Sequence, residues 1–328
     1  VTISPNIIAA RIKNGSLQSE FLTVFLNTKY GQQQLERGLK VVAQPTISTS
    51  LVSKIKVFVP GKVDEQKITS IFLSSIDNYE KSKTYYTQAQ HLLESELGLD
   101  KLSFQKPVGY TARFSELEQS RRLDAEHFYP AFQRLATQMP DHIKLVPLGT
   151  QLSFCQRGKQ PVYSANGLPV INSKHVQNNK IVFEGNRKAA PNPIADLQIR
   201  YGDLLMNGTG RGTLGRAAPY LTDRKAIPDN HVTMLRSRTL DPAYLSFYLN
   251  SQVGQLQVEM HQRGTSGQLE LYPFDIRKFL VWAAPESFQK EIRNLYDRAA
   301  ESEQKSRELL DQAKIQVEQL IEEAASER

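Results

Sequence analysis

Apolar and small residues follow a seven-residue repeat in two long segments, residues 63–98 and 286–325. The repeat positions are Ile68/Phe72, Ser75/Tyr79, Ser82/Tyr86 and Ala89/Leu93 in the first segment, and Ile292/Tyr296, Ala299/Glu303, Ser306/Leu310, Ala313/Val317 and Leu320/Ala324 in the second. This is the spacing of helices that wrap around a partner helix. Small residues often fill one column and large residues the other, which lets two helices approach closely. The pattern predicts two helices, each roughly 50–55 Å long at about 1.5 Å per residue.

The two stripes have the same register, and neither could stay exposed to water. We therefore predict that the two helices pair with each other as a coiled coil. The residues expected to pair them are Ile68, Phe72, Tyr79, Tyr86, Leu93, Ile292, Tyr296, Leu310 and Val317. The alternative is a single amphipathic helix that lies on its own domain in each case.

The remaining patterns predict shorter elements. Isoleucines predict a strand at 1–13, apolar residues at helical spacing predict a helix at 18–30, and β-forming residues predict a strand at 51–59. Between residues 143 and 240, short β-type runs alternate with turns rich in Gly, Pro and Asn. That alternation is typical of a compact mixed domain with irregular strands and loops. The predicted fold class is therefore α+β, with two long helices beside a mixed domain.

The chain also repeats itself, since residues near 1–104 match residues near 228–328 at an offset of about 224. Residues 21–27 (FLTVFLN) line up with 244–250 (YLSFYLN), Gly31-Gln32 with Gly254-Gln255, and Pro60 with Pro285. The copies of the predicted 18–30 helix and 51–59 strand are 242–257 and 276–284. So long a period indicates a duplicated domain rather than a solenoid. The first copy has its long helix but only the tail of a body, so we expect a truncated or partly observed protein.

Composition narrows the class of protein. Cys155 is the only cysteine, so the chain can form no internal disulfide and no thiolate metal cluster, which favours the reducing cytoplasm. No apolar run approaches the ~18 residues that span a bilayer. The net charge of +7 favours a polyanionic partner. A lysine or arginine placed on a phosphate releases a condensed counterion, although many basic proteins bind no nucleic acid.

The most conspicuous loop is 207–216 (NGTGRGTLGR), which contains a formal G-x-G-x-x-G. A dinucleotide site needs a helix that begins at this turn and an acidic residue ~20 positions later. Here Pro219 and a second β-type run follow instead. The residues favour a flexible basic loop between strands, in which Arg211 and Arg216 supply charge or reach base edges. A plain hairpin turn fits the same residues.

The sequence contains no catalytic motif that its predicted elements support. Neither Pro-Asp pair, at 140–141 or 228–229, has the downstream carboxylate and lysine of a nuclease core. The nearest string to an amino-methyltransferase motif, 191–194 (PNPI), lacks its second proline and its aromatic residue. The six histidines show no metal-ligand spacing, and there is no Walker loop. We therefore predict a binding module that is not an enzyme and holds no metal.

Basic and amide side chains are dense in the loops of residues 143–240, in a series that also includes Arg187 and Lys188. Arginine and the amides are the side chains that read guanine and adenine edges. The predicted DNA-binding residues are Arg157, Lys159, Asn172, Lys174, His175, Asn207, Arg211, Arg216, Asn230 and His231. Any one of them could instead be solvated surface, and their density in one domain is what favours an interface.

A body of irregular strands followed by a long helix, all of it duplicated, resembles the specificity (S) subunit of type I restriction–modification systems. The similar segments are, in chain order, 121–128 (RRLDAEHF), Gly158 and Pro161 with 167–171 (GLPVI), 201–205 (YGDLL) before the glycine-rich loop, 244–250, and Pro285 at the start of the long helix. Their order is that of the family's target recognition domain and conserved helix.

The resemblance implies four domains. They are 1–62, the C-terminal part of a first target recognition domain; 63–104, the first conserved long helix and connector; 105–285, a second target recognition domain; and 286–328, the second conserved long helix. The helices would pack antiparallel and set the spacing between recognition domains. Each recognition domain would read half of a split sequence in double-stranded DNA.

The resemblance also implies partners. Two modification (methyltransferase) subunits would dock on this frame and carry S-adenosylmethionine, and a restriction (motor-nuclease) subunit would join for cleavage. The chain itself would bind no cofactor, contact no membrane and carry no catalytic residue. Two other readings stay open: the C-terminal recognition half of a single-chain restriction–methylation enzyme, and a coiled-coil scaffold without a nucleic-acid role.

Overall fold

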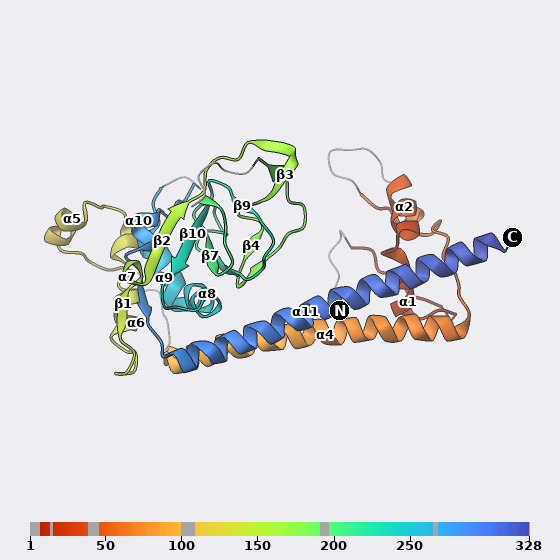
Figure 1. Cartoon of the computed structure of the whole chain (residues 1–328), viewed down its shortest axis with the longest axis horizontal. Helices are drawn as coiled ribbons and strands as arrows, with labels where there is room; N and C mark the ends of the chain where they lie inside the picture. Colours follow the sequence, from red (N-terminus) through yellow and green to blue (C-terminus); the bar gives the residue numbers. More distant parts are fainter. Residues whose placement is uncertain are drawn as a thin grey trace. The chain divides into compact units, whose positions relative to one another are not determined.

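The computed structural model describes residues 7–13, 16–38, 46–99, 109–190, 197–264 and 268–327. They form an α+β structure, as predicted, with two compact units (Figure 1). The first unit comprises Val1–Tyr85 with Asp297–Arg328, and the second comprises Tyr86–Tyr296. The two long helices, α4 (Lys62–Glu96) and α11 (Glu286–Ser326), each contribute residues to both units. The predicted boundaries near 62, 104 and 285 divide the chain differently and stay predictions.

The first unit packs two short helices on the long ones. Its helices are α1 (Ser19–Leu26), α2 (Lys29–Arg37) and α3 (Thr49–Val52), with parts of α4 and α11. Phe21 and Phe25 of α1 are buried against Ile68 of α4 and Val317 of α11. Burying one such side chain contributes about 1.5–3 kcal/mol, so this apolar cluster holds the unit together.

The predicted helix pair is confirmed, and it is antiparallel in each unit. In the first unit the Ser75 hydroxyl donates to the Ser306 carbonyl at 2.9 Å. In the second unit the rings of Tyr86 and Tyr296 meet edge to face at 5.9 Å. Early residues of α4 therefore meet late residues of α11, and the reverse. Of the predicted pairing residues, these are buried: Ile68, Leu93, Ile292, Tyr296 and Val317. These are half-buried: Phe72, Tyr86 and Leu310.

One residue of the predicted seam is wrong, and one seam contact joins two small residues. Ser75 lies opposite Ser306, with hydroxyl oxygens 3.2 Å apart, whereas Ile68 shares a buried cluster with Ala313. Tyr79 is 45% exposed and lies outside the seam. The helices come close where serine meets serine, and a tyrosine ring one turn from that contact has no room between them.

The second unit is built on a four-stranded antiparallel sheet in the order β2-β10-β7-β8. The strands are β2 (Leu152–Arg157), β10 (Val232–Ser237), β7 (Asp203–Asn207) and β8 (Ala217–Tyr220). Every residue of β7 is buried, because the strand is covered on both faces. Helix α8 (Pro242–Asn250) packs on β7 and β8, and α9 (Gln252–His261) follows it (Figure 1).

Smaller elements surround this sheet. The strand β3 (Tyr163–Ile171) lies between β6 (Lys188–Ala189) and β9 (Ile227–Pro228), β4 (Val176–Gln177) pairs with β5 (Lys180–Ile181), and β1 (Leu145–Pro147) pairs with β11 (Leu280–Trp282). The short helices are α5 (Phe114–Ser120), η2 (Ala125–Phe128), α6 (Ala131–Ala136), α7 (Leu148–Gln151) and α10 (Pro273–Ile276). This is the predicted mixture of irregular strands and loops.

Three predicted elements need correction. The helix at 18–30 breaks after Leu26, and its copy at 242–257 breaks after Asn250, so each is two helices. Residues 7–13 form no strand, and the other part of the predicted 1–13 strand lies outside the described residues. Residues 51–59 also form no strand, although their copy contains β11. A lone strand cannot pair its backbone groups. β11 has β1 beside it, whereas 51–59 has no strand beside it within the described ranges.

No helix within the described ranges is both long and apolar enough to cross a membrane.

Candidate nucleic-acid interface

The sheet gathers three loops at one of its ends. β2 ends at Arg157 and β7 ends at Asn207, while β10 begins at Val232 and β8 begins at Ala217. Because neighbouring strands run in opposite directions, these four termini lie at the same end of the sheet. We call this the loop end, formed by residues 158–162, 208–216 and 229–231.

The turn after β3 joins the loop end. β3 pairs in parallel with β9, which leads directly into 229–231. The Asp229 N–H donates to the Ile171 carbonyl at 2.9 Å, and the Asn207 side-chain amide donates to the Ser173 carbonyl at 3.0 Å. The ten DNA-binding residues predicted from separate sequence segments therefore converge on one region.

The glycine-rich loop is a hairpin tip that stands open to solvent. The Gly215 N–H donates to the Asn207 carbonyl at 2.9 Å, and the Asn207 N–H donates to the Arg216 carbonyl at 2.9 Å. Gly210, Gly212 and Gly215 have φ of +99°, +80° and +80°, values that residues with a side chain rarely adopt. A Cβ added at Gly212 would meet nothing within 4 Å. The loop leads into β8 and not into a helix, so it is not a dinucleotide-binding turn.

Eight of the ten predicted residues keep a solvent-accessible side chain, and Arg157 is one of them. Lys159, Lys174, Arg211 and His231 are exposed, and Asn172, Arg216 and Asn230 are half-buried. Neighbouring atoms hold two of them in place. The Lys174 ammonium donates to the Gly185 carbonyl at 3.1 Å, and His231 Nδ1 lies 2.8 Å from the Thr209 hydroxyl. These side chains form a cationic and amide surface over the end of the sheet.

Two predicted residues are buried and cannot reach a partner in this structure. The Asn207 amide lies inside the unit and donates to the carbonyls of Ser173 and Val176, at 3.0 and 3.1 Å. His175 is 1% exposed, and its Nδ1 accepts from the Asn172 N–H at 3.0 Å. Burial lowers the pKa of His175, which keeps the ring neutral. Both residues shape the turn after β3 because that turn crosses over the end of β7.

Arg157 is half-buried and serves as a support for the loop end. Its guanidinium donates to the carbonyls of Gly208 and Leu271, at 3.1 and 2.9 Å. It also forms an ion pair with Glu270 at 3.4 Å and lies 5.0 Å from the ring centroid of Tyr272. Arg157 therefore ties the glycine-rich loop to residues 268–272.

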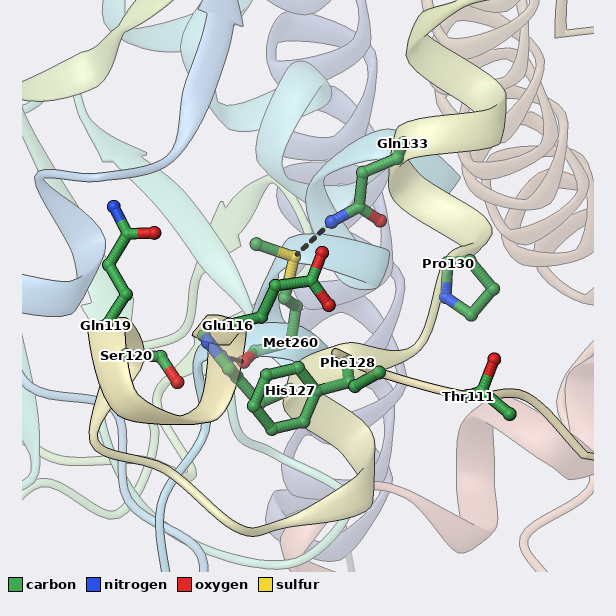
Figure 2. Close-up of a pocket in the computed structure, with 10 residues that line it drawn as sticks. Thr111, Glu116, Gln119, Ser120, His127, Phe128, Pro130, Gln133 and Met260 are labelled. Atoms are coloured by element: carbon green, nitrogen blue, oxygen red, sulfur yellow. Dashed lines mark hydrogen bonds between the residues drawn. The ribbon is translucent and has the colours of Figure 1, made fainter. Parts of the chain in front are cut away.

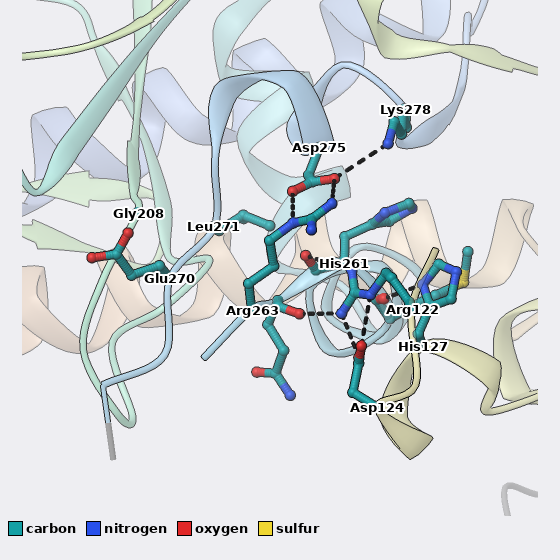
Figure 3. A network of polar contacts seen from close by, with 12 residues as sticks. Arg122, Asp124, His127, Gly208, His261, Arg263, Glu270, Leu271, Asp275 and Lys278 are labelled. Atoms are coloured by element: carbon teal, nitrogen blue, oxygen red, sulfur yellow. Dashed lines mark hydrogen bonds and ion pairs between the residues drawn. The ribbon is translucent and has the colours of Figure 1, made fainter. Parts of the chain in front are cut away.

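A second polar network fixes the segment that runs beside this loop (Figure 3). Arg122, at 7% exposure, forms an ion pair with Asp124 and donates to the Gln262 carbonyl at 2.5 Å. Arg263 forms two bonds to the fully buried Asp275, at 2.7 and 3.1 Å. Breaking such a pair would leave a buried charge, which costs several kcal/mol (about 3–5). Through the bonds of Arg122 to the carbonyls of His261 and Gln262, the 121–128 motif holds the segment that leads into Arg263.

Titratable groups around this network serve the fold. Burial lowers the pKa of His261 to about 4, so this ring is neutral near neutral pH. Burial raises the pKa of the Cys155 thiol to about 11, which leaves little reactive thiolate. In the part of the chain that the structure describes, no three His, Cys, Asp or Glu residues are placed to hold a metal ion.

A pocket of about 430 Å³ lies between α5, η2 and α9 (Figure 2). His127 Nδ1 is 3.0 Å from the Met260 carbonyl, and the Glu116 carboxylate accepts from the Arg113 N–H at 2.8 Å. The two titratable groups of the pocket are therefore occupied by the local fold. The pocket is separate from the cationic loop end, which is the stronger candidate site.

Sequence reasoning missed the exposed residues just after Lys159. Gln160, Val162 and Tyr163 are exposed, and the guanidinium of Arg187 lies 3.4 Å from the Tyr163 ring centroid. The signal in the sequence was a lysine followed by Gln-Pro-Val-Tyr directly after a strand. Arg187 and Lys188 belong to the same surface because β6 pairs with β3.

No protein-family model and no curated protein matches the chain. Several solved structures are similar to it, and three are described here. They are the HsdS subunit from Thermoanaerobacter tengcongensis (14% identity, 92% of this chain and 69% of that chain, TM-score 0.33) and the type I restriction-modification system S subunit from M. genitalium (11%, 93% and 73%, 0.45). The third describes complex assembly and conformational transition of the type I R-M system (14%, 90% and 71%, 0.36).

The chain is thus similar to structures of the family that its sequence segments resemble. At identities of 11–14% and TM-scores of 0.33–0.45, function does not transfer from those proteins to this chain.

Proposed function

We propose that the second unit is a sequence-reading DNA-binding domain, and that the chain is the specificity subunit of a type I restriction–modification complex. The observation that carries this proposal is the convergence of cationic and amide side chains from four separate segments on one end of a sheet. Lysines there would contact phosphates and set the position on the duplex. Arginine and the amides would read base edges in the major groove.

The glycine-rich loop is the central reader in this proposal. Arg211 is exposed next to Gly212, where an added Cβ would meet nothing, so the tip can enter a groove. Arginine pairs with the O6 and N7 atoms of guanine through two hydrogen bonds. The bonds from the loop to Leu269, Leu271 and His231 hold its base rigid. A rigid base reduces the ordering cost of binding.

The long helices would act as the frame of the complex. Their exposed faces carry charged pairs such as Lys81–Asp77 at 2.6 Å and Lys83–Glu80 at 3.0 Å. In this proposal two methyltransferase subunits, which carry S-adenosylmethionine, dock on the frame, and a motor-nuclease subunit joins for cleavage. The chain supplies recognition of half of a bipartite DNA site and has no catalytic residue of its own.

Duplex binding at stepwise salt concentrations tests the proposal. We expect the purified chain to bind mixed-sequence duplex DNA with an affinity that falls linearly on a log–log salt plot. Lys159→Ala should lower that slope by about one, because one phosphate contact is lost. Arg211→Ala should weaken binding to the selected cognate sequence by ~1–3 kcal/mol if the guanidinium contacts a base.

Lys290→Ala is the matched control for loss of one positive charge. Lys290 lies on α11, pairs with Glu286, and has a side chain that is 70% exposed. Its removal should leave the cognate affinity unchanged. Binding that is too weak to measure at low salt, or that shows no salt dependence, would contradict the proposal and favour the scaffold reading.

A further inference from the structure

A protruding segment follows β2 at the loop end. We call residues 159–166 the finger; it begins after Gly158 and ends before Gly167. A Cβ added at Gly158 would collide with the Asp229 carbonyl, and one added at Gly167 would collide with the Ala189 carbonyl. At each end of the finger, neighbouring backbone lies so close to the glycine that no side chain would fit. Both ends of the finger are therefore held in place by that backbone.

The finger is part of a two-stranded ribbon. Its partner strand is 187–190, since the Val170 N–H donates to the Arg187 carbonyl at 2.8 Å and the Ala190 N–H donates to the Val162 carbonyl at 3.0 Å. The register shifts between Tyr163 and Leu168, both of which lie opposite Ala189. Residues 164–167 are therefore left outside the strand pairing. Of these, 164–166 are exposed.

The ribbon carries both positively charged and neutral exposed side chains. The guanidinium of Arg187 lies 3.4 Å from the Tyr163 ring centroid, and Lys159 and Lys188 are exposed. The two segments 159–166 and 187–190 contain three basic residues, Lys159, Arg187 and Lys188, and no acidic residue. Such a ribbon complements a polyanion.

Two of the exposed neutral side chains are an amide and an aliphatic group. Gln160 is exposed, and Val162 is 74% exposed. In the major groove, an amide pairs with N6 and N7 of adenine, and an aliphatic group contacts the thymine methyl. The two side chains thus suit the same base pair.

We propose that the finger is a second base-reading element, which enters the major groove as a β-ribbon and selects A·T base pairs through Gln160 and Val162. The groove is about 12 Å wide and admits a two-stranded ribbon. This inference rests on the proposed DNA-binding function and assigns part of the recognised sequence. The glycine-rich loop, with Arg211, would read a different position of the same half-site.

Selection from a library of random duplexes tests the finger. The full chain and its variants are incubated with the library, and bound DNA is amplified and sequenced. The wild type should enrich a motif with at least one A·T position. The double variant Gln160→Ala with Val162→Ala should lower the preference for A·T at that position by about tenfold, as expected for one lost base contact. The remaining positions of the motif should stay enriched.

Three controls make the result specific. Arg211→Ala should relax a different position. Lys159→Ala should weaken binding to all sequences and leave the motif unchanged. If the double variant melts at a lower temperature than the wild type, Val162→Thr takes its place. Threonine keeps the shape of the valine side chain, so this variant tests the contact to the thymine methyl group without a loss of volume.

Each outcome decides between the two proposals. A wild-type motif without any A·T position, or a double variant that selects the same motif as the wild type, overturns the role of the finger while DNA reading stands. A wild type that binds duplex DNA but enriches no motif overturns sequence reading and the finger together.

Discussion

The two copies of the repeat build the same helix corner. At the corner between α1 and α2 the Thr28 hydroxyl donates to the Phe25 carbonyl at 2.6 Å, and the Gln32 amide donates to the Leu26 carbonyl at 2.7 Å. The matching bonds in the second unit are Ser251 to Tyr248 at 2.7 Å and Gln255 to Leu249 at 2.8 Å. The aligned pairs Gly31-Gln32 and Gly254-Gln255 therefore belong to the same type of hydrogen-bonded helix corner.

The same steric reason requires a glycine at each corner. A Cβ on Gly31 would collide with the Phe25 carbonyl, and one on Gly254 would collide with the Leu249 carbonyl. The second helix of each pair starts so close to the end of the first that only glycine fits. The repeat therefore preserves the local backbone path of the corner, although side chains elsewhere differ between the two copies.

The copies differ in the residue that holds the start of the first corner helix, α1 or α8, on the long helix. In the first unit Glu65 accepts from the Gln18 N–H at 2.5 Å and pairs with Lys62 at 2.9 Å. In the second unit Gln289 accepts from the Asp241 N–H at 2.6 Å and donates to the Ala284 carbonyl at 2.8 Å. The same backbone group is satisfied by a charged acceptor in one copy and by a neutral one in the other.

The largest expected effect tests whether each copy buries the same repeat position of its long helix. Ile68 and Ile292, at the same repeat position, are 1% and 0% exposed. Ile68→Ala and Ile292→Ala should each lower the free energy of unfolding by about 3 kcal/mol, because each leaves a cavity. Chemical denaturation measures the loss. Ile76→Ala on α4, at 43% exposure, is the control and should cost far less. Equal losses at Ile68 and Ile76 would show that the seam is misplaced.

The next effect tests the helix corner. Gly31→Ala and Gly254→Ala should each lower the free energy of unfolding by about 2 kcal/mol, since backbone must move to admit the methyl group. Thermal melting of both variants measures this loss. Gly61→Ala is the matched control, because its added Cβ would lie 3.7 Å from the nearest atom, on Asp64. A corner glycine that tolerates alanine as well as Gly61 does would refute the shared type of corner.

The smallest expected effect tests the difference between a charged acceptor, Glu65, and a neutral one, Gln289. Hydrogen bonds from Lys62 and from the Gln18 N–H lower the pKa of Glu65. A carboxyl whose pKa is lower in the folded state contributes stability above its unfolded pKa and loses it as pH falls through the folded value. The first unit should therefore weaken below about pH 4.5, the usual range for glutamate.

Glu65→Gln should flatten this acid dependence, because the amide keeps the acceptor for the Gln18 N–H and cannot be protonated. The converse variant, Gln289→Glu, introduces a carboxyl that must give up the bond to Ala284. Hydrogen exchange of the amides of Gln18 and Asp241 at pH 3–6 would report each corner separately. Similar acid sensitivity at the two amides in the unaltered protein would contradict the comparison.

Much of the molecule was predictable from local patterns. The heptad stripes predicted α4 and α11 because a helix must bury a continuous apolar face, and the seam contains most of the residues chosen for it. The offset of the repeat aligned the residues of the two corners, although a single helix was predicted across each of them. Turn residues at short intervals predicted the irregular strands of the second unit, and the missing helix after 207–216 excluded a dinucleotide site.

The errors arose where a partner far along the chain decides the outcome. Residues 51–59 have strand-forming side chains, but a strand forms at their copy because β1 is there to pair with it. Tyr79 has the heptad spacing of a seam residue, but a serine contact one turn away fills the close approach. His175 and Asn207 have the chemistry of DNA readers, but the turn after β3 buries them against the end of β7.

The sequence by itself determined the helices, the repeat and the choice of side chains, because periodicity and residue type act over a few neighbours. Only the tertiary structure decided which of those side chains meet. Four antiparallel strand termini bring residues from 157 to 231 to one end of a sheet, and burial then separates supports such as Arg157 from exposed side chains such as Arg211. That separation follows from packing around a shared core, which no local pattern records.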